Sequence, residues 1–509
     1  MSYDVLLINP TRVGIDSYLT PPIHLMYLAK ALIDAGHTYK IINVHEAFCR
    51  KAHVFENDVT AMKIKKALEE EYIDKILQYN AKLIGIGSVP PSYDFTEKLV
   101  LALKGKNNNT PIIVGGSLGL PLKDLWYKNT EIDFLCEGDG ECLIVELLEN
   151  LSTPDRWKKI PGLYWRTENG WRGNKPDLPI NLDYIKAPLP DMVDFALYSN
   201  FYYQWINKTL PPQLRLQNSE IIWPVVLSRG CIYNCTFCFH FNRIHRRHSV
   251  EYIIDHLRTL KSKYGVTFVV TMDDLVMANR NWFMDLCRAL EKEKLGIKIF
   301  TSGGKANLVD EEMATAMAKA SFIRISYGIE SGSQAILDEM QKQSTVEDNR
   351  RAVKFTTNAG IFVHLNIVIG MPGETKSTLD ETKHFLIDVA KENNLSEENV
   401  SISFATPYPG TQLYNKAVQL GIIHDMRDYI MNVKGVGDPN PILCSLSKNA
   451  LQSFPNLVRR QIINLRLKKE KHHIERLIRS IVLSRPITQV GRAILPTSVK
   501  RFVKKLISR

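Results

Sequence analysis

Three cysteines stand close together near the middle of the chain, within residues 228–240. Cys231, Cys235 and Cys238 have the spacing C-x3-C-x2-C. Soft thiolate ligands favour iron–sulfur clusters, zinc or copper(I). A structural zinc site needs four ligands, and a nearby histidine could supply the fourth. The nearby histidines are His240, His245 and His248. Three cysteines can alternatively hold three irons of a [4Fe–4S] cluster and leave the fourth iron open to a substrate or cofactor.

The segment that carries these cysteines alternates between strand-like and helix-like patterns over residues 222–423. Six parallel strand–helix units predict a partial TIM-like barrel, in which function lies at the carboxyl ends of the strands. The cysteine loop follows the first expected strand and therefore lies at that end. The expected strands are 224–228, 267–271, 297–302, 322–328, 361–369 and 399–405.

Residues 1–150 show the same alternation, beginning with an apolar strand at 4–10 and a helix at 21–37. This order predicts a Rossmann-like, doubly wound parallel sheet, which binds ligands past the carboxyl ends of its strands. No G-x-G-x-x-G opens a helix, so a nicotinamide cofactor is not indicated. The candidate ligand-binding residues at these ends are Gly85, Ser88, Gly115 and Gly116.

The length of 509 residues predicts two or three domains, and 45% hydrophobic residues provide an ordinary globular core. We expect a connector at 151–221, with a hairpin at 160–176. Eight cysteines, of which five are scattered outside the array, do not indicate a disulfide framework, so a reducing, cytoplasmic setting is expected. The N-terminus reads as a strand rather than a signal peptide, and no apolar run is long enough to span a membrane.

The net charge of +11 is concentrated at the C-terminus, where residues 459–509 carry 15 Lys and Arg against two acids. Residues 424–450 look irregular, and basic amphipathic helices are expected at 474–483 and 498–509. Within the expected helical, basic region 424–509, these helices suit an anionic membrane surface. Docking on the body and nucleic-acid binding are alternatives. The latter is disfavoured because the last 50 residues offer only Phe502 for base stacking.

The cysteine array, with Phe237 just before its last member, resembles the radical S-adenosylmethionine (SAM) superfamily. In that family the open iron binds SAM, and one electron from the cluster cleaves it to a 5′-deoxyadenosyl radical. The resemblance extends to four motifs: T-M-D-D (271–274), Y-G-I-E-S-G-S (327–333), I-G-M-P-G-E-T (369–375) and Y-P-G-T (408–411). It implies that the cofactor-binding residues are Phe237, Asp274, Glu330, Ser331, Gly370, Pro372, Gly373, Tyr408 and Gly410.

Two of these motif regions also have simpler interpretations. Asp274 could cap the helix that follows it, and Thr411 makes a good N-cap in the same way. The basic run at 241–249 matches the family only by position, and we expect it to be a solvated loop.

The N-terminal domain resembles the cobalamin-binding domain that precedes many radical SAM domains. The similar pieces are I-N-P (8–10), P-P-x-x-L-x-Y-L-A (21–29), V-G-G-S (114–117) and E-G-D-G-E (137–141). The D-x-H-x-x-G signature of other cobalamin proteins is absent, which implies a cobalt without a protein imidazole. A structural Rossmann-like domain that binds no corrinoid is the alternative.

These resemblances imply a cobalamin-dependent radical SAM enzyme that methylates an unactivated carbon. Its partners would be a small-molecule or lipid substrate and a low-potential electron donor of the ferredoxin or flavodoxin type. The enzyme alternatives are a cyclase or rearrangement enzyme without methyl transfer, and a tRNA methylthiotransferase. The non-enzyme alternative is a zinc-stabilised binding module. The expected location is cytoplasmic, with a peripheral position at the inner face of the cell membrane left open.

Overall fold

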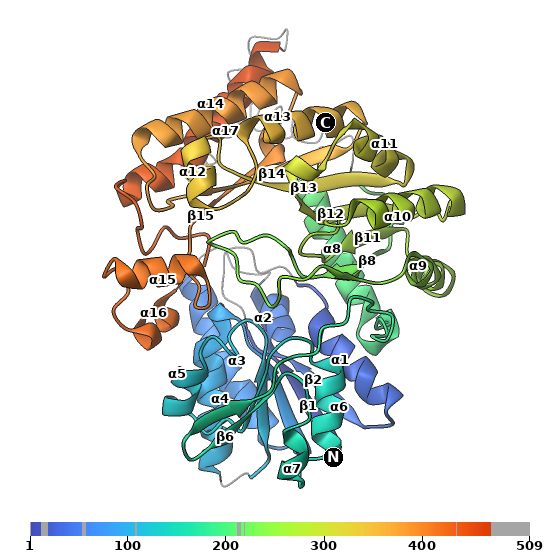
Figure 1. Cartoon of the computed structure of the whole chain (residues 1–509), viewed down its shortest axis with the longest axis vertical. Coiled ribbons are helices and arrows are strands. Elements are labelled where there is room, and N and C mark those ends of the chain that lie inside the picture. The colour runs from blue at the N-terminus through green and yellow to red at the C-terminus, as the bar shows by residue number, and fades with distance from the viewer. Residues whose placement is uncertain are drawn as a thin grey trace, which may run out of the picture.

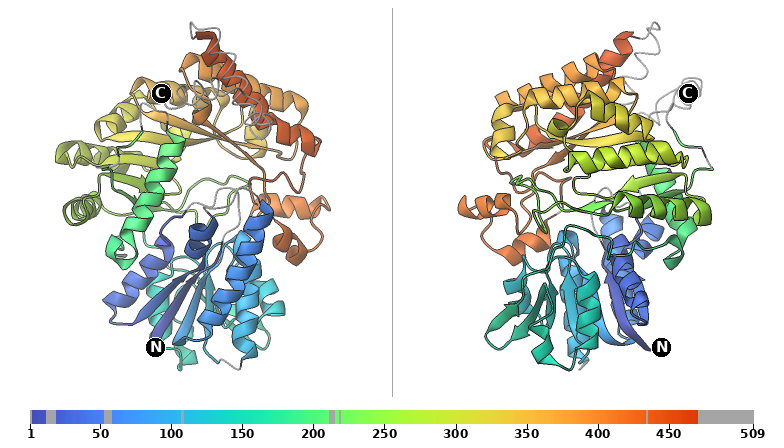
Figure 2. Two further views of the ribbon diagram at one scale, coloured as in Figure 1. Left: turned by 180° about the vertical axis from the view of Figure 1, so that it is seen from behind. Right: turned by 45° about the vertical axis from the view of Figure 1, so that its right-hand side comes forward.

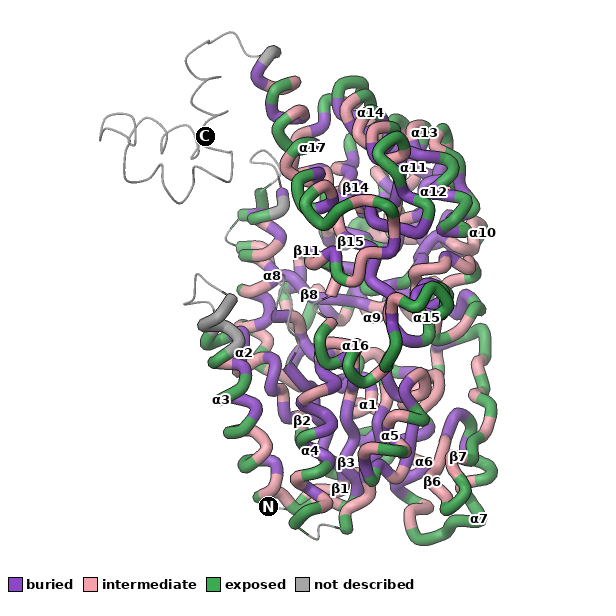
Figure 3. Tube along the Cα trace, turned by 90° about the vertical axis from the view of Figure 1, so that its left-hand side faces the viewer, coloured by how far each residue is buried: buried purple, intermediate pink, exposed green. Residues whose placement is uncertain are grey.

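The computed structural model describes residues 2–11, 19–52, 58–106, 109–210, 215–217, 219–433 and 435–469. Two main sheets follow one another along the long axis of the molecule, with the N-terminal sheet at one end and the barrel sheet at the other (Figure 1). Buried segments run through both sheets, and exposed segments lie mainly on the surrounding helices (Figure 3). The α/β class expected for both halves is confirmed.

The N-terminal sheet has seven strands in the order β2-β1-β3-β4-β5-β6-β7. Its first five strands are parallel, and the β6–β7 hairpin continues the same sheet in antiparallel fashion. The hairpin expected at 160–176 is confirmed, but it also extends the N-terminal sheet beyond residue 150 into the segment that we expected to be a connector. The strands are β1 (Ser2–Asn9), β2 (Tyr39–Asn43), β3 (Asn80–Gly87), β4 (Ile112–Gly115), β5 (Phe134–Cys136), β6 (Leu163–Thr167) and β7 (Gly170–Gly173).

Helices cover both faces of this sheet because successive strand side chains point to opposite sides. Val5 and Leu7 pack against one pair of helices, α1 and α6, whereas Leu6 and Ile8 pack on the opposite face against α4 and α5. The helices are α1 (Ile23–Asp34), α2 (Val44–Ala52), α3 (Asp58–Ile76), α4 (Tyr93–Gly105), α5 (Lys123–Asn129), α6 (Glu141–Glu149) and α7 (Pro154–Trp157).

The barrel sheet has six parallel strands in the order β15-β14-β13-β12-β11-β8. β8 and β15 are its two edges, so the barrel is open. Five of the six strands agree to within two residues with the ranges expected from the sequence, whereas the first, expected at 224–228, begins two residues earlier and ends three residues earlier. They are β8 (Ile222–Val225), β11 (Phe268–Thr271), β12 (Lys298–Gly304), β13 (Phe322–Glu330), β14 (Phe362–Ile369) and β15 (Val400–Phe404).

Most of the barrel helices begin at a polar residue whose side chain accepts a backbone hydrogen bond. Ser249, Asn279 and Thr411 cap α9, α10 and α15, which confirms Thr411 in that role. The helices around the barrel are α8 (Phe195–Thr209), α9 (Val250–Tyr264), α10 (Arg280–Glu293), α11 (Glu311–Lys319), α12 (Gln334–Glu339), α13 (Val346–Asn358), α14 (Lys376–Glu392) and α15 (Gln412–Gln419).

The C-terminal region differs from the expectation. Residues 424–450, expected to be irregular, contain α16 (Met426–Asn432) and the start of α17 (Lys448–Lys469). α17 lies along α14 at the far end of the barrel (Figure 2). It buries Leu451, Phe454 and Val458 in the barrel core. Residues 459–469 therefore belong to a helix docked on the body. The expected helices at 474–483 and 498–509 lie outside the described residues.

In the part of the chain that the structure describes, no helix combines the length and the apolar character needed to cross a bilayer.

Candidate active site

The cysteine loop is held in place by its backbone. It follows β9 (Ser228–Arg229), which pairs in antiparallel fashion with β10 (Arg246–Arg247). The amide of Thr236 donates to the carbonyl of Met340 at 3.0 Å, and its own carbonyl accepts from the amide of Leu413 at 2.8 Å. The loop is thus fixed between the ends of α12 and α15. Phe237 packs into an apolar cluster that includes Met371, which places it beside the G-M-P-G turn.

The three thiols share one partly buried environment. Cys235 is buried, whereas Cys231 and Cys238 are partly exposed. Burial, followed by the charge of Cys235, raises the pKa of the Cys238 thiol to about 12. The pKa of Cys231 is also raised, chiefly by burial. The thiols of Cys231 and Cys238 are therefore neutral without a metal, and a bound metal would drive their deprotonation.

A site for a single metal ion requires several ligand atoms that converge on one point. Among the described residues, no three His, Cys, Asp or Glu side chains converge closely enough to hold a single metal ion. In a [4Fe–4S] cluster each cysteine binds a different iron, so the three sulfurs do not have to converge on one point. Three soft sulfurs on one loop therefore fit a cluster of this kind.

Two adjacent carboxylates at the end of β11 brace the start of the cysteine loop. Asp273 accepts hydrogen bonds from the amide of Leu227 at 3.1 Å and from the hydroxyl of Ser228 at 2.7 Å. Asp274 accepts from the amide of Gly230 at 2.9 Å. Burial raises the pKa of Asp273 to about 7, although these hydrogen bonds oppose the shift. The suggested capping role of Asp274 is wrong, because α10 begins six residues later and has its own cap.

Glu330 is the last residue of β13, and its charge contributes to the raised pKa of the Cys238 thiol. Its φ of 64° is unusual for a residue with a side chain and is typical of strained functional positions. Its carboxylate pairs with the buried ammonium of Lys342 at 2.7 Å. Lys305 donates to the carbonyl of Lys342 and lies 4.1 Å from the ring centre of Tyr233. Burial lowers the pKa of Lys305 to about 8.

Ser331 and the two glycine turns form the adjoining edge of the barrel. The hydroxyl of Ser331 lies 3.0 Å from that of Thr382, so it links the end of β13 to α14. Gly370 and Gly373 both have positive φ, which permits the sharp G-M-P-G turn around Pro372. The amide of Gly370 donates to the carboxylate of Glu374.

The Y-P-G-T turn reaches toward the N-terminal domain. Gly410 has a φ of 90°, and a Cβ there would approach Phe239 to 3.0 Å and Pro121 to 3.1 Å. The glycine thus allows close contact with both halves of the molecule. The hydroxyl of Tyr408 lies near Gly435, and burial raises the pKa of this tyrosine.

A cavity of about 350 Å³ lies where the carboxyl ends of the two sheets face each other. Gly85, Gly115 and Gly116 line it from the N-terminal sheet, and Gly230 and Asp274 line it from the barrel. The structure therefore brings these predicted residues together at one cavity, one residue away from Cys231.

Ser88 is the exception among the predicted N-terminal residues. It is fully buried, is not part of the cavity wall, and places its hydroxyl 3.3 Å from that of Ser92. Its role is to support the neighbouring turn, because its amide donates to the carbonyl of Gly115 at 3.0 Å. A Cβ on Gly116 would come within 2.5 Å of the Ser88 carbonyl oxygen, so this turn requires glycine.

The cavity fits a corrinoid in the chemistry of its wall. Glycines at the ends of β3 and β4 expose backbone to a large ligand, and an apolar recess continues between the sheet and the helices α1 and α6. The recess is lined by Leu28, Ile113, Leu143 and Ile144.

Four charged side chains that were not singled out from the sequence join the two halves at this cavity. Arg229 contacts Asp139 at 2.9 Å and Glu141 at 2.7 Å, and Arg246 grips Asp139 with both nitrogens. Burial opposes ionisation of Asp139, but the hydrogen bond of Arg246 and the charge of Arg229 outweigh it and lower the pKa of Asp139. The expectation of a solvated loop at 241–249 is wrong, because Arg246 is fully buried in β10.

The sequence contained a signal for these contacts. The two acids belong to the E-G-D-G-E turn and the arginines flank the cysteine loop, but their pairing requires the tertiary structure.

Comparison with known proteins agrees with this arrangement. The chain matches the profile of the radical SAM superfamily over residues 225–386 and that of the B12 binding domain over residues 16–148. It belongs to the cobalamin-binding radical SAM enzymes. Its cofactors are accordingly a [4Fe–4S] cluster, SAM and cobalamin, and the zinc-stabilised binding module is set aside.

Relatives of this radical SAM chain include two methyltransferases. An uncharacterized methyltransferase of Pyrococcus horikoshii is 26% identical over 94% of this chain and 97% of its own length. The cytidylyl-2-hydroxyethylphosphonate methyltransferase of Streptomyces wedmorensis is 24% identical, with 86% and 87% covered. The anaerobic magnesium-protoporphyrin IX monomethyl ester cyclase of Rubrivivax gelatinosus is 24% identical, with 80% and 68% covered.

Solved structures support the fold of this radical SAM chain. The cobalamin-dependent enzyme OxsB, with aqua-cobalamin and SAM bound, superposes with a TM-score of 0.64 at 15% identity, covering 99% of this chain and 75% of its own. The methyltransferase TsrM of Kitasatospora setae, with cobalamin and a [4Fe–4S] cluster bound, gives 0.60 at 18% identity, with 82% and 76% covered.

Proposed function

We propose that this enzyme methylates an unactivated carbon of a small-molecule or lipid substrate. The observation that carries the proposal is the single cavity lined both by the glycine-rich ends of β3 and β4 and by the ribbon that leads to Cys231. Similarity to two methyltransferases supports the same reaction. When bound, the cluster supplies the electron that cleaves SAM to a 5′-deoxyadenosyl radical, and the corrinoid carries the methyl group.

In this proposal the protein holds and orients the reactants. Cys231, Cys235 and Cys238 bind three irons of the cluster, and the carboxylates of Asp273 and Asp274 fix the backbone that precedes them.

SAM would lie along the barrel edge that carries the remaining candidate residues. The positive-φ turn at Gly370 and Gly373 and the turn at Gly410 would expose backbone groups to it. The Glu330–Lys342 pair is close enough to Cys238 for both of its charges to act on that thiol. A low-potential donor of the ferredoxin or flavodoxin type would reduce the cluster.

A radical cyclisation without methyl transfer is the second candidate. It is favoured by the similarity to the cyclase of Rubrivivax gelatinosus, which extends over 80% of this chain. The two reactions differ in what becomes of SAM. Methyl transfer converts one SAM to S-adenosylhomocysteine and a second to 5′-deoxyadenosine, whereas cyclisation requires only the latter.

The test is anaerobic reconstitution with iron, sulfide and cobalamin, followed by incubation with methyl-labelled SAM and a reductant. We expect about four irons per chain, formation of 5′-deoxyadenosine and label on the corrinoid. Cys235→Ala should abolish 5′-deoxyadenosine formation. Cys444→Ala, which changes a cysteine outside the array, should not. Deoxyadenosine from Cys235→Ala would refute the cluster assignment. Deoxyadenosine without labelled corrinoid in the parent would favour the cyclase.

We further propose that the C-terminal tail places the enzyme at an anionic membrane. The support is the sequence of residues 470–509, which carries ten Lys and Arg against Glu470 and Glu475. Residues 459–469 are excluded from this role because the apolar side of α17 is already packed on the barrel.

A further inference from the structure

The four charged side chains at the domain junction form one closed network, here called the junction clamp: Asp139, Glu141, Arg229 and Arg246. Arg229 uses one terminal nitrogen for each acid, at 2.9 Å to Asp139 and 2.7 Å to Glu141. Arg246 places its second terminal nitrogen 2.9 Å from Asp139. Two cations thus meet two anions, so the clamp carries no net charge.

The clamp is buried, so its charged groups must lie close together in well-defined positions. The side chain of Arg246 is 0% exposed and that of Glu141 is 8% exposed. Desolvation of buried charges largely cancels their attraction, so such a network adds little to stability compared with apolar residues. Removal of one partner is nevertheless strongly unfavourable, because the other charge remains buried and unpaired. A network of this kind specifies one relative arrangement of its elements more than it strengthens the fold.

The clamp lies next to the cysteine loop on one side and next to the N-terminal sheet on the other. Arg229 and Arg246 are directly paired across the β9–β10 ribbon, and Arg229 is two residues before Cys231. Asp139 and Glu141 lie at the start of α6, in the opposite domain. All four side chains line the central cavity. The same contacts therefore hold the cluster-bearing loop and the corrinoid-facing wall.

We propose that Asp139 and Glu141 are positioning residues that set the distance and orientation between the cluster loop and the corrinoid wall. This inference rests on the proposed function in one respect, which is that both cofactors bind. The acids act through the arginine ribbon and do not themselves touch the reacting atoms.

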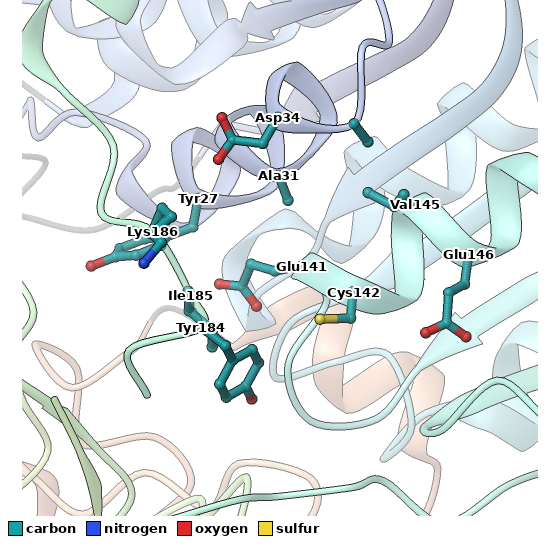
Figure 4. Close-up of a pocket in the computed structure, with 11 residues that line it drawn as sticks. Tyr27, Ala31, Asp34, Glu141, Cys142, Val145, Glu146, Tyr184, Ile185 and Lys186 are labelled. Atoms are coloured by element: carbon teal, nitrogen blue, oxygen red, sulfur yellow. The ribbon is translucent and has the colours of Figure 1, made fainter. Parts of the chain in front are cut away.

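The two acids contribute unequally. Asp139 contacts both arginines, whereas Glu141 contacts only Arg229. The second carboxylate oxygen of Glu141 has no hydrogen-bond partner in the described structure. Glu141 also borders an outer cleft of about 390 Å³, where Figure 4 shows it among Tyr27, Tyr184 and Cys142. Neutralising Asp139 should therefore loosen the junction more than neutralising Glu141.

The experiment uses the anaerobic holoenzyme with reduced cluster and cob(II)alamin, both of which are paramagnetic. Iron and corrinoid content are measured first, and pulsed EPR then reports the dipolar interaction between the two centres. The variants are Asp139→Asn and Glu141→Gln, which keep shape and remove charge. The control is Arg427→Gln, which breaks the Arg427–Glu97 pair, also a link to the N-terminal domain but outside the cavity wall.

We expect the parent and Arg427→Gln to give the same narrow distribution of distances. Asp139→Asn should give a broader and shifted distribution at full cofactor content, with Glu141→Gln between them. Unchanged distributions in both acid variants, or an equal change in the control, would overturn the proposal. If Asp139→Asn loses a cofactor, the distance distribution of Glu141→Gln decides whether the proposal holds.

A parent that binds no corrinoid would instead refute the proposed function and leave the clamp testable. Amide hydrogen exchange on the cobalamin-free protein would then be measured at 139–141 and 228–247. Faster exchange in the acid variants at both segments supports the clamp, and exchange equal to that of the parent refutes it.

Discussion

Glu374 contacts the G-M-P-G turn, which lies at the barrel edge where SAM is proposed to bind. It is 1% exposed, and burial raises its pKa to about 7. Its carboxyl group accepts the amide of Gly370, while its other oxygen has no hydrogen-bond partner among the described residues. The protonated form is thus the one that the fold prefers, and a proton is taken up there on folding.

We predict that Glu374→Gln changes the pH dependence of stability. A folded-state pKa above the ordinary value of 4.5 means that the stabilising contribution is complete below about pH 4.5 and is lost as the pH rises to about 7. At pH 8 the glutamine variant should be more stable than the parent by roughly 3 kcal/mol, and near pH 4.5 the two should be equal.

Thermal midpoints of the two proteins between pH 4.5 and 8 provide the measurement. Glu381→Gln, which changes an exposed glutamate on α14, is the control and should follow the parent at every pH. A constant difference between Glu374→Gln and the parent would contradict the predicted titration.

At the scale of elements, the end of β11 and the loop after β8 behave as one unit. Asp273→Ala would remove the acceptor of two buried backbone amides and one hydroxyl, at a cost of roughly 1–3 kcal/mol for each group left unpaired. We predict a lower melting temperature together with a lower iron content after reconstitution, because the segment before Cys231 loses its support.

Asp310→Ala separates this effect from general destabilisation. Asp310 caps α11 and lies away from the cysteine loop, so its loss should cost about 1 kcal/mol. Its iron content should equal that of the parent. Full iron content in Asp273→Ala would show that the loop does not depend on this carboxylate.

Periodicity and strand-end chemistry were sufficient to predict both sheets and the position of the cysteine loop. They failed to predict elements whose local sequence disfavours the structure that tertiary packing stabilises. α17 contains Pro455, which has no amide hydrogen and usually argues against a helix interior. Its apolar side nevertheless packs on the barrel. The cavity-lining glycines could be predicted from strand ends, but the clamp pairs residues that are 88 to 107 positions apart in the sequence.

At the scale of the whole molecule, the prediction concerns the tail. A chain that ends at residue 469 keeps α17 and loses most of the basic charge. We expect the full chain to float with vesicles that contain phosphatidylglycerol, and the shortened chain to remain with the unbound protein. Vesicles of phosphatidylcholine alone are the control and should bind neither. Equal flotation of both chains would remove the tail from this role.

The docked helix also creates a mechanical connection. α17 has 22 residues and is therefore a rod of about 33 Å. Near its first turn, Leu451 faces Gly370, and Ser445 just ahead of it donates to the carbonyl of Glu374 at 3.1 Å. A displacement of the chain at Lys469 would therefore be transmitted along the helix to the G-M-P-G turn. Binding of the tail to another surface would thereby affect the position of the barrel edge where SAM is proposed to lie.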